Sequence, residues 1–113
     1  MRTRPPAILA AAAISIAALG GQIAISGAAS TRTVTLKNIA FSPKSLSISK
    51  GTSVAFAFRD GSTVHNVTST GAKRFRSISN RSSGTQKRMF NAAGTYRYAC
   101  TLHPGMSGRI TVH

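Results

Sequence analysis

The sequence predicts an all-β fold, a sandwich of two sheets, for the chain after residue 30. Short stretches in which apolar and polar residues alternate recur from Thr33 onward, as strands with one buried face require. Glycine, proline and serine separate these stretches, and such residues favour turns. No heptad, internal repeat or long amphipathic helix is present in this part of the sequence. Many short strands joined by turns are typical of a β-sandwich.

The first 29 residues have a different composition. Residues 1–4 carry two arginines, residues 7–19 are almost entirely alanine, isoleucine and leucine, and residues 27–29 are small. A basic start, an apolar run and a small-residue cleavage site are the three parts of a secretory signal peptide. An uncleaved membrane anchor is the alternative, although alanine and glycine make a poor membrane-spanning helix.

We therefore expect residues 1–29 to be removed after Ala28 or Ala29, and residues 30–113 to form the folded domain. The protein is then exported, either to the periplasm or to the outside of the cell and its surface.

The chain is strongly basic, with 15 lysine and arginine residues against the single acid Asp60 and a net charge of +14. Such a charge favours an anionic partner: a redox partner with an acidic docking surface, an anionic envelope polymer or a membrane surface. An exported protein rarely meets nucleic acid, so no specific nucleic-acid binding is expected. The alternative is that the charge only keeps the protein soluble.

Individual strands can be placed from the alternation. The clearest row of inward-facing side chains is Val54, Phe56 and Phe58. Pro43 interrupts an earlier strand, because proline cannot donate a hydrogen bond in a sheet interior. Strands are expected at 33–37, around Leu46 and Ile48, and at 54–58, 85–90, 94–100 and 108–112.

Residues 71–88 are the least informative part of the sequence. They are rich in arginine, lysine, serine and glycine, which suggests loops, and only Phe75 and Ile78 are candidate core residues. In the strand that follows, an inward-facing Phe90 places Arg88 and Gln86 on the same face.

The single cysteine, Cys100, cannot form an internal disulfide bond, so it pairs with another molecule, remains a free thiol or binds a metal. It follows a strand on which Tyr96 and Tyr98 share one face. His103 and Met106 come three and six residues later, on a short loop that contains Pro104 and Gly105. A thiolate, an imidazole and a thioether can converge there, and they suit a soft or borderline metal, above all copper.

A second imidazole would complete a copper site of two histidines, a cysteine and a weakly bound methionine. His65 in the sequence Val-His-Asn-Val is the candidate. The predicted metal ligands are therefore His65, Cys100, His103 and Met106, holding one type 1 copper ion.

These residues carry a resemblance to a known family. The pattern Cys-x2-His-x2-Met after Gly-x-Tyr-x-Tyr, with an upstream His-Asn-Val, resembles the small blue copper proteins called cupredoxins. The spacing is most similar to that of the amicyanin and plastocyanin branch, and the resemblance extends from about Thr33 to the C-terminus. It implies a Greek-key β-sandwich.

The resemblance also implies roles for further residues. Asn66 is similar to the family residue that joins the two ligand loops, with its backbone amide donating to the sulfur of Cys100 and its side chain reaching Thr101. The edge of His103 is expected at the surface among apolar residues such as Leu102.

The implied function is that of a monomeric one-electron carrier between redox partners. Protein ligands fill all four copper positions, and with Asp60 as the only acid no pair of catalytic acids is possible, so we expect no enzymatic activity. Two alternatives remain: an exported protein for copper scavenging or delivery, and a basic envelope-binding module in which the metal residues are incidental.

Overall fold

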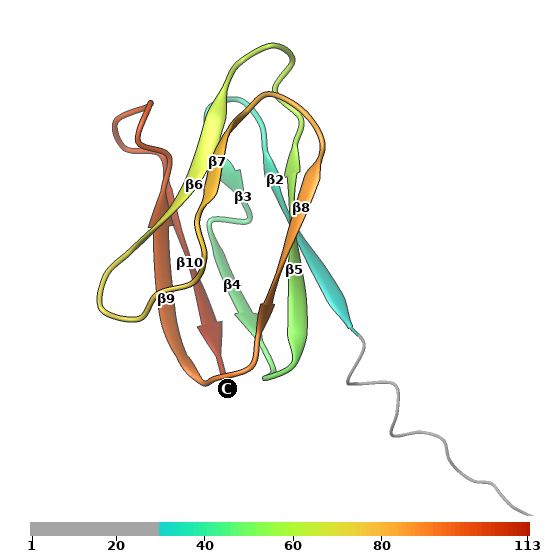
Figure 1. Ribbon diagram of the computed structural model, residues 1–113, viewed down its shortest axis with the longest axis vertical. Coiled ribbons are helices and arrows are strands. Elements are labelled where there is room, and N and C mark those ends of the chain that lie inside the picture. The colour runs from blue at the N-terminus through green and yellow to red at the C-terminus, as the bar shows by residue number, and fades with distance from the viewer. Residues whose placement is uncertain (1–29) are drawn as a thin grey trace, which may run out of the picture. The chain divides into compact units, whose positions relative to one another are not determined.

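The computed structural model describes residues 30–113, and the expected signal peptide, residues 1–29, lies outside the described residues. Two sheets make up the described part (Figure 1). The five-stranded sheet has the order β4 (Ser45–Ile48), β10 (Ser107–Val112), β9 (Gly94–Ala99), β6 (His65–Thr70) and β7 (Ile78–Arg81). The four-stranded sheet has the order β3 (Phe41–Ser42), β2 (Thr31–Leu36), β5 (Thr52–Phe58) and β8 (Thr85–Phe90).

The strand order confirms the predicted Greek-key sandwich. Strands β2 and β5 pair in parallel, as do β4 and β10, whereas the other pairs are antiparallel. The chain passes from one sheet to the other after β3, β4, β5, β7 and β8. Within residues 30–113, no helix is long and apolar enough to cross a membrane.

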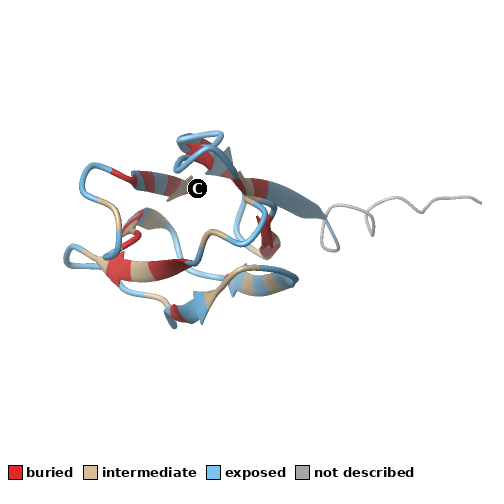
Figure 2. Cartoon of the chain, turned by 90° about the horizontal axis from the view of Figure 1, so that it is seen from above, coloured by how far each residue is buried: buried red, intermediate tan, exposed pale blue. Residues whose placement is uncertain are grey.

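The core lies between the sheets and is centred on aromatic side chains. The predicted row Val54, Phe56 and Phe58 is confirmed, since all three side chains are almost fully buried. Tyr98 of β9 packs edge-to-face on Phe41 of β3 and Phe56 of β5, with ring centroids 4.8 and 5.5 Å apart. These contacts join the two sheets, and such aromatic pairs add to the stability gained by burial. In Figure 2 buried and exposed bands alternate along several strands.

Tyr98 has a close neighbour in Gly108, its partner residue across the β9–β10 pair. A Cβ atom at Gly108 would lie 2.7 Å from the tyrosine ring, so only glycine leaves room for it. Among the described residues, the Tyr98 hydroxyl is the one buried side-chain polar atom without a hydrogen-bond partner. Burial also raises the pKa of Tyr98.

We predict that replacing Tyr98 with Phe leaves the fold intact and stabilises the metal-free protein by up to about 1 kcal/mol. The substitution keeps the ring and removes an unsatisfied buried hydroxyl group, which costs free energy in the folded state. Denaturant unfolding of the two metal-free proteins measures the difference. A loss of stability above about 1 kcal/mol would contradict the prediction and indicate a hidden partner for the hydroxyl group.

One feature of the region 71–88 was not predicted correctly from its composition. Residues 78–81 form a strand, β7, rather than a loop, and β7 is an edge strand opposite the edge strand β8. Ile78 is buried and Phe75 packs against the core, so both predicted core anchors are confirmed.

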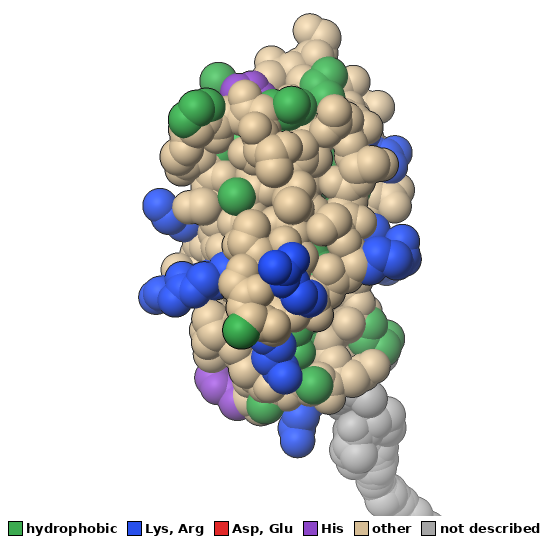
Figure 3. Space-filling model, turned by 60° about the vertical axis from the view of Figure 1, so that its left-hand side comes forward, with side chains coloured by type: hydrophobic (Ala, Val, Ile, Leu, Met, Phe, Trp, Pro, Cys, Tyr) green, Lys and Arg blue, Asp and Glu red, His purple; other side chains and the backbone are tan. Residues whose placement is uncertain are grey.

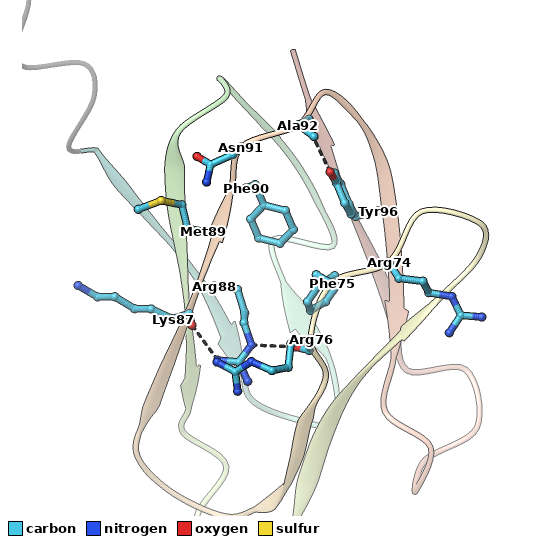
Figure 4. Close-up of a pocket in the computed structure, with 10 residues that line it drawn as sticks. All are labelled: Arg74, Phe75, Arg76, Lys87, Arg88, Met89, Phe90, Asn91, Ala92 and Tyr96. Atoms are coloured by element: carbon cyan, nitrogen blue, oxygen red, sulfur yellow. Dashed lines mark hydrogen bonds between the residues drawn. The ribbon is translucent and has the colours of Figure 1, made fainter.

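Arg88 does share the inward face of β8 with Phe90, and its position explains how the sandwich tolerates it. The Arg88 guanidinium group donates to the carbonyl oxygen of Arg76 at 2.7 Å (Figure 4) and to that of Ser77 at 3.1 Å, and both residues precede β7. Its side chain therefore joins β8 to the segment that precedes β7. Burial, followed by repulsion from Arg76, lowers the pKa of Arg88.

Candidate metal centre

The β9–β10 hairpin positions three of the four predicted ligands. Cys100 follows the last residue of β9, and Met106 precedes the first residue of β10. The amide of Cys100 donates to the carbonyl oxygen of Met106 at 2.9 Å, and the amide of Met106 donates to that of His103 at 3.1 Å. Gly105, with a φ of 84°, allows the tight turn between them. The loop therefore closes on itself and brings Cys100 and Met106, its first and last predicted ligands, close together.

His65 is the first residue of β6, which pairs with β9 in the same sheet. Its side chain is fully buried. Its Nδ1 atom lies 3.8 Å from Cys100 Sγ and 3.2 Å from His103 Nδ1. The ligand loop and the start of β6 thus meet at one end of the molecule, opposite the C-terminus in Figure 1.

The three donor atoms have the spacing of ligands around a single ion. His103 Nδ1 lies 3.4 Å from Cys100 Sγ, which completes a triangle with edges of 3.2, 3.4 and 3.8 Å. A metal bonded to two imidazole nitrogens at about 2.0 Å and to a thiolate at about 2.3 Å holds these donors roughly 3.3–3.8 Å apart. His65, Cys100 and His103 are also the one group of three potential ligands of this kind within residues 30–113.

The hydrogen bond to Asp60 assigns the tautomer of His65. Its Nε2 atom lies 2.7 Å from Asp60 Oδ2, and a carboxylate only accepts, so Nε2 carries the proton. In the neutral ring the lone pair on Nδ1 then faces Nδ1 of His103 and the sulfur of Cys100. Atoms whose lone pairs face one another in this way are stabilised by a cation that binds between them. Two imidazoles and a thiolate in a buried site fit copper and exclude magnesium or calcium, which prefer oxygen ligands.

Met106 is buried at the same end, with 4% of its surface exposed. Its backbone bonds to Cys100 and His103 hold it at the base of the ligand loop. The structure therefore places the backbone of Met106 next to those of Cys100 and His103. Its thioether as an axial ligand stays a prediction.

Asn66 joins the two ligand-bearing segments, as the resemblance implied. Its side-chain amide nitrogen donates to Thr101 Oγ1 at 2.8 Å, and its side-chain oxygen accepts from the Thr101 amide at 3.1 Å. It also contacts Asn80 of β7 and Thr68 of β6. The predicted bond from the Asn66 backbone amide to the sulfur of Cys100 stays a prediction.

Asp60 is the functional residue that the sequence analysis missed. Its carboxylate accepts from His65 and from the backbone amides of Asn38 at 3.1 Å and Ile39 at 3.0 Å. The hydrogen bond from His65 contributes most to lowering the pKa of Asp60, and that from Ile39 follows. A signal was available in the sequence, because the only acid in a chain of net charge +14 lies five residues before a predicted metal ligand.

The comparison with protein families gives one match, which covers nearly the whole chain. The family described as the cupredoxin-like domain matches residues 7–112. No curated protein sequence matches the chain significantly.

Solved structures of similar fold are numerous. An oxidized amicyanin mutant aligns with a TM-score of 0.66 at 23% identity, over 73% of this chain and 81% of amicyanin. A purple cupredoxin from Nitrosopumilus maritimus aligns with a TM-score of 0.61 at 24% identity, over 73% and 99% of the two chains. At these identities the likeness shows the fold.

A copper-containing nitrite reductase from Thermus scotoductus aligns with a TM-score of 0.65 at 26% identity. The alignment covers 74% of this chain, whereas this chain spans only 22% of the reductase. The likeness therefore concerns one part of a much larger protein.

Proposed function

The chain belongs to the cupredoxin-like domain family, and from this premise we propose that it is an exported one-electron carrier that holds one copper ion. The proposed ligands are His65, Cys100, His103 and Met106. The observation that carries the proposal is the donor triangle, whose edges of 3.2–3.8 Å suit a single copper ion. Copper, when bound, supplies a change of one electron between its cupric and cuprous states.

The chain's own residues restrict how far the ligands can move. His65, Cys100 and Met106 are at most 4% exposed, and the hydrogen bonds of Asn66 and Asp60 fix the segments around them. A site that keeps one geometry in both oxidation states needs little reorganisation when an electron arrives. Buried ligands also slow loss of the ion, which favours the carrier over a protein for copper scavenging or delivery.

Two observations support the absence of enzymatic activity. The proposed ligand set leaves no metal position for a substrate. The only carboxylate of the chain, Asp60, is already engaged by His65 and two backbone amides, so it is not free to act as a general acid or base.

Export remains part of the proposal and depends on residues 1–29, with residues 30–113 as the functional domain. The expected location is the periplasm or the outside of the cell and its surface. This follows from the three-part pattern of the N-terminal sequence.

The end of the molecule that carries the ligand loop is the proposed docking face for redox partners. His103 is partly exposed there, and the ligand loop from Cys100 to Met106 contains no charged residue. Leu102, Val64 and Ile39 are 45%, 41% and 51% exposed, and each lies in or next to a segment that contacts the site. Figure 3 shows hydrophobic side chains around a histidine at this end. Electron-transfer partners use small, transient interfaces of this kind, which a monomer presents freely.

On the face shown in Figure 3, positive charge lies mainly away from this end of the molecule. In Figure 3 the lysine and arginine side chains cover mainly the middle and lower part of the molecule, and no acidic side chain is visible. A groove of about 410 Å³ between β8 and the segment before β7 is lined by Arg74, Arg76 and Arg88 (Figure 4). We propose that these charges attract redox partners with acidic docking surfaces, or an anionic envelope or membrane surface.

The rate of electron transfer distinguishes the carrier from a copper-delivery protein. We expect the copper-loaded protein to exchange electrons with an acidic redox protein within milliseconds, and to keep its copper for hours in the presence of a competing chelator. Raising the ionic strength from 0.01 to 0.15 M should slow the exchange, because the Debye length falls from about 30 to 8 Å. Rapid loss of copper to the chelator with slow electron exchange would instead support delivery.

Replacing Met106 with Gln should keep the intense colour and lower the reduction potential. The amide oxygen is a harder ligand than the thioether and stabilises the cupric state, whereas the cysteine and the two histidines remain. Optical titration with a redox mediator measures the shift. Met89→Gln is the matched control, because Met89 is 61% exposed on β8 and far from the ligands in sequence. An unchanged potential in Met106→Gln would contradict the proposed axial role.

A further inference from the structure

The turn between β2 and β3 has an unusual backbone. Asn38 and Ile39 both have a φ of 54°, and they are the only non-glycine residues with positive φ within residues 30–113. Hydrogen bonds between Lys37 and Ala40 close the turn at 3.0 and 3.1 Å. Two-residue turns of this kind favour Asn-Gly, and a β-branched residue such as isoleucine rarely adopts positive φ. The backbone at Ile39 is therefore strained.

The backbone amides of the strained turn donate to a single carboxylate, that of Asp60. The amide of Asn38 donates to Asp60 Oδ1, and the amide of Ile39 donates to Asp60 Oδ2. Oδ2 also accepts the Nε2 proton of His65 at 2.7 Å. The side chain of Asp60 is only 16% exposed. It is therefore held by the turn on one side and contacts a proposed metal ligand on the other.

We propose that Asp60 is the positioning residue of the metal site, and that the turn from Lys37 to Ala40 holds it in place. By accepting from Nε2, the carboxylate selects one tautomer of His65 and directs the Nδ1 lone pair toward Cys100 and His103. This inference rests on the proposed copper site, and it extends that site to a surface turn more than 20 residues earlier in the chain.

The carboxylate acts through both orientation and charge. A carboxylate behind a ligating histidine fixes its ring and makes it a stronger donor. As the only negative side chain in the sequence, Asp60 also favours the cupric ion over the cuprous ion. An asparagine at this position keeps an oxygen for His65 only by turning its amide group toward the Asn38 amide, so it loses the charge and one contact. Alanine loses every contact.

Three variants of Asp60 separate these roles. Asp60→Asn should lower cupric affinity about 10- to 100-fold, the usual effect of losing an outer partner of a metal ligand. It should also raise the reduction potential, because the cupric form loses more than the cuprous form. Asp60→Glu should retain part of the cupric affinity and shift the reduction potential less than Asp60→Asn does. Asp60→Ala should convert the single Nε2–H tautomer of His65 in the metal-free protein into a mixture, read from the ring-nitrogen shifts by NMR.

Ile39→Gly supplies the matched control. It keeps the backbone amide that donates to Asp60, and it should raise the thermal midpoint by removing backbone strain. If Asp60→Ala does not fold, the double variant Ile39→Gly with Asp60→Ala provides an Asn-Gly turn that forms without the carboxylate.

The proposal predicts that the double variant retains the full metal and tautomer defect. A folded Asp60→Ala protein or double variant that keeps the wild-type His65 tautomer, copper affinity and reduction potential would overturn the proposal. Asp60 would then serve only to stabilise the turn. Because the tautomer is measured without metal, this result is independent of whether the wild-type protein binds copper as proposed.

Discussion

Replacing Cys100 with Ser is expected to abolish the intense colour of the copper-loaded protein completely. The colour requires a thiolate bonded to the cupric ion, and the chain contains no other cysteine. A serine hydroxyl does not ionise at neutral pH to replace it. Copper affinity should fall by more than the roughly 10- to 100-fold that loss of an outer partner causes. Visible absorption and chelator competition measure the two effects.

Two controls make this result specific. His113→Gln changes the third histidine of the chain, which is exposed at the C-terminus, and should leave the colour unchanged. Denaturant unfolding of the metal-free Cys100→Ser protein should show that it remains folded under the conditions of the spectrum, although its buried hydroxyl group costs about 1–3 kcal/mol if it finds no partner. Colour that persists in Cys100→Ser would show that the proposed ligand is wrong.

Replacing Asn66 with Ala is expected to cost the metal-free protein about 3–4 kcal/mol of unfolding free energy. The side chain of Asn66 is 5% exposed and takes part in four hydrogen bonds, with Thr101 twice and with Thr68 and Asn80 once each. Each such bond contributes about 1 kcal/mol, so the four bonds together account for the expected loss. This is a large fraction of the roughly 5–15 kcal/mol that stabilises a typical domain.

Asn80→Ala is the comparison for this prediction, because Asn80 is exposed and shares only one of those bonds. It should cost about 1 kcal/mol in the same denaturant experiment. Copper affinity should fall in Asn66→Ala, since the ligand loop loses both contacts through Thr101, and remain unchanged in Asn80→Ala. Equal losses of stability in the two variants would contradict a joining role for Asn66.

The sequence predicted those elements whose residues alternate clearly. Gly94–Ala99 and Ser107–Val112 form strands within one residue of the predicted bounds, and the buried row from Val54 to Phe58 lies where alternation placed it. Strand β7, in contrast, has the sequence Ile-Ser-Asn-Arg, and a single apolar residue gives no period to detect. Its pairing with β6 depends on tertiary contacts, which composition does not reveal.

For the metal centre, too, the sequence predicted some residues and not others. Cys100, His103 and Met106 could be grouped from their spacing on one loop, and His65 was added because the chemistry required a second imidazole. Asp60 lies in the sequence Asp-Gly-Ser-Thr, which is typical of turns. Its role depends on the folded positions of His65 and the Asn38–Ile39 turn, and neither contact can be deduced from sequence spacing.

The central claim is that four side chains surround one copper ion, and the optical and electron-spin spectra of the protein with one equivalent of cupric ion test it most directly. The account predicts an intense absorption band near ~600 nm and an unusually small copper hyperfine splitting, both caused by the short bond to the Cys100 thiolate. A pale complex with the spectrum of an ordinary cupric ion bound by nitrogen and oxygen would contradict it.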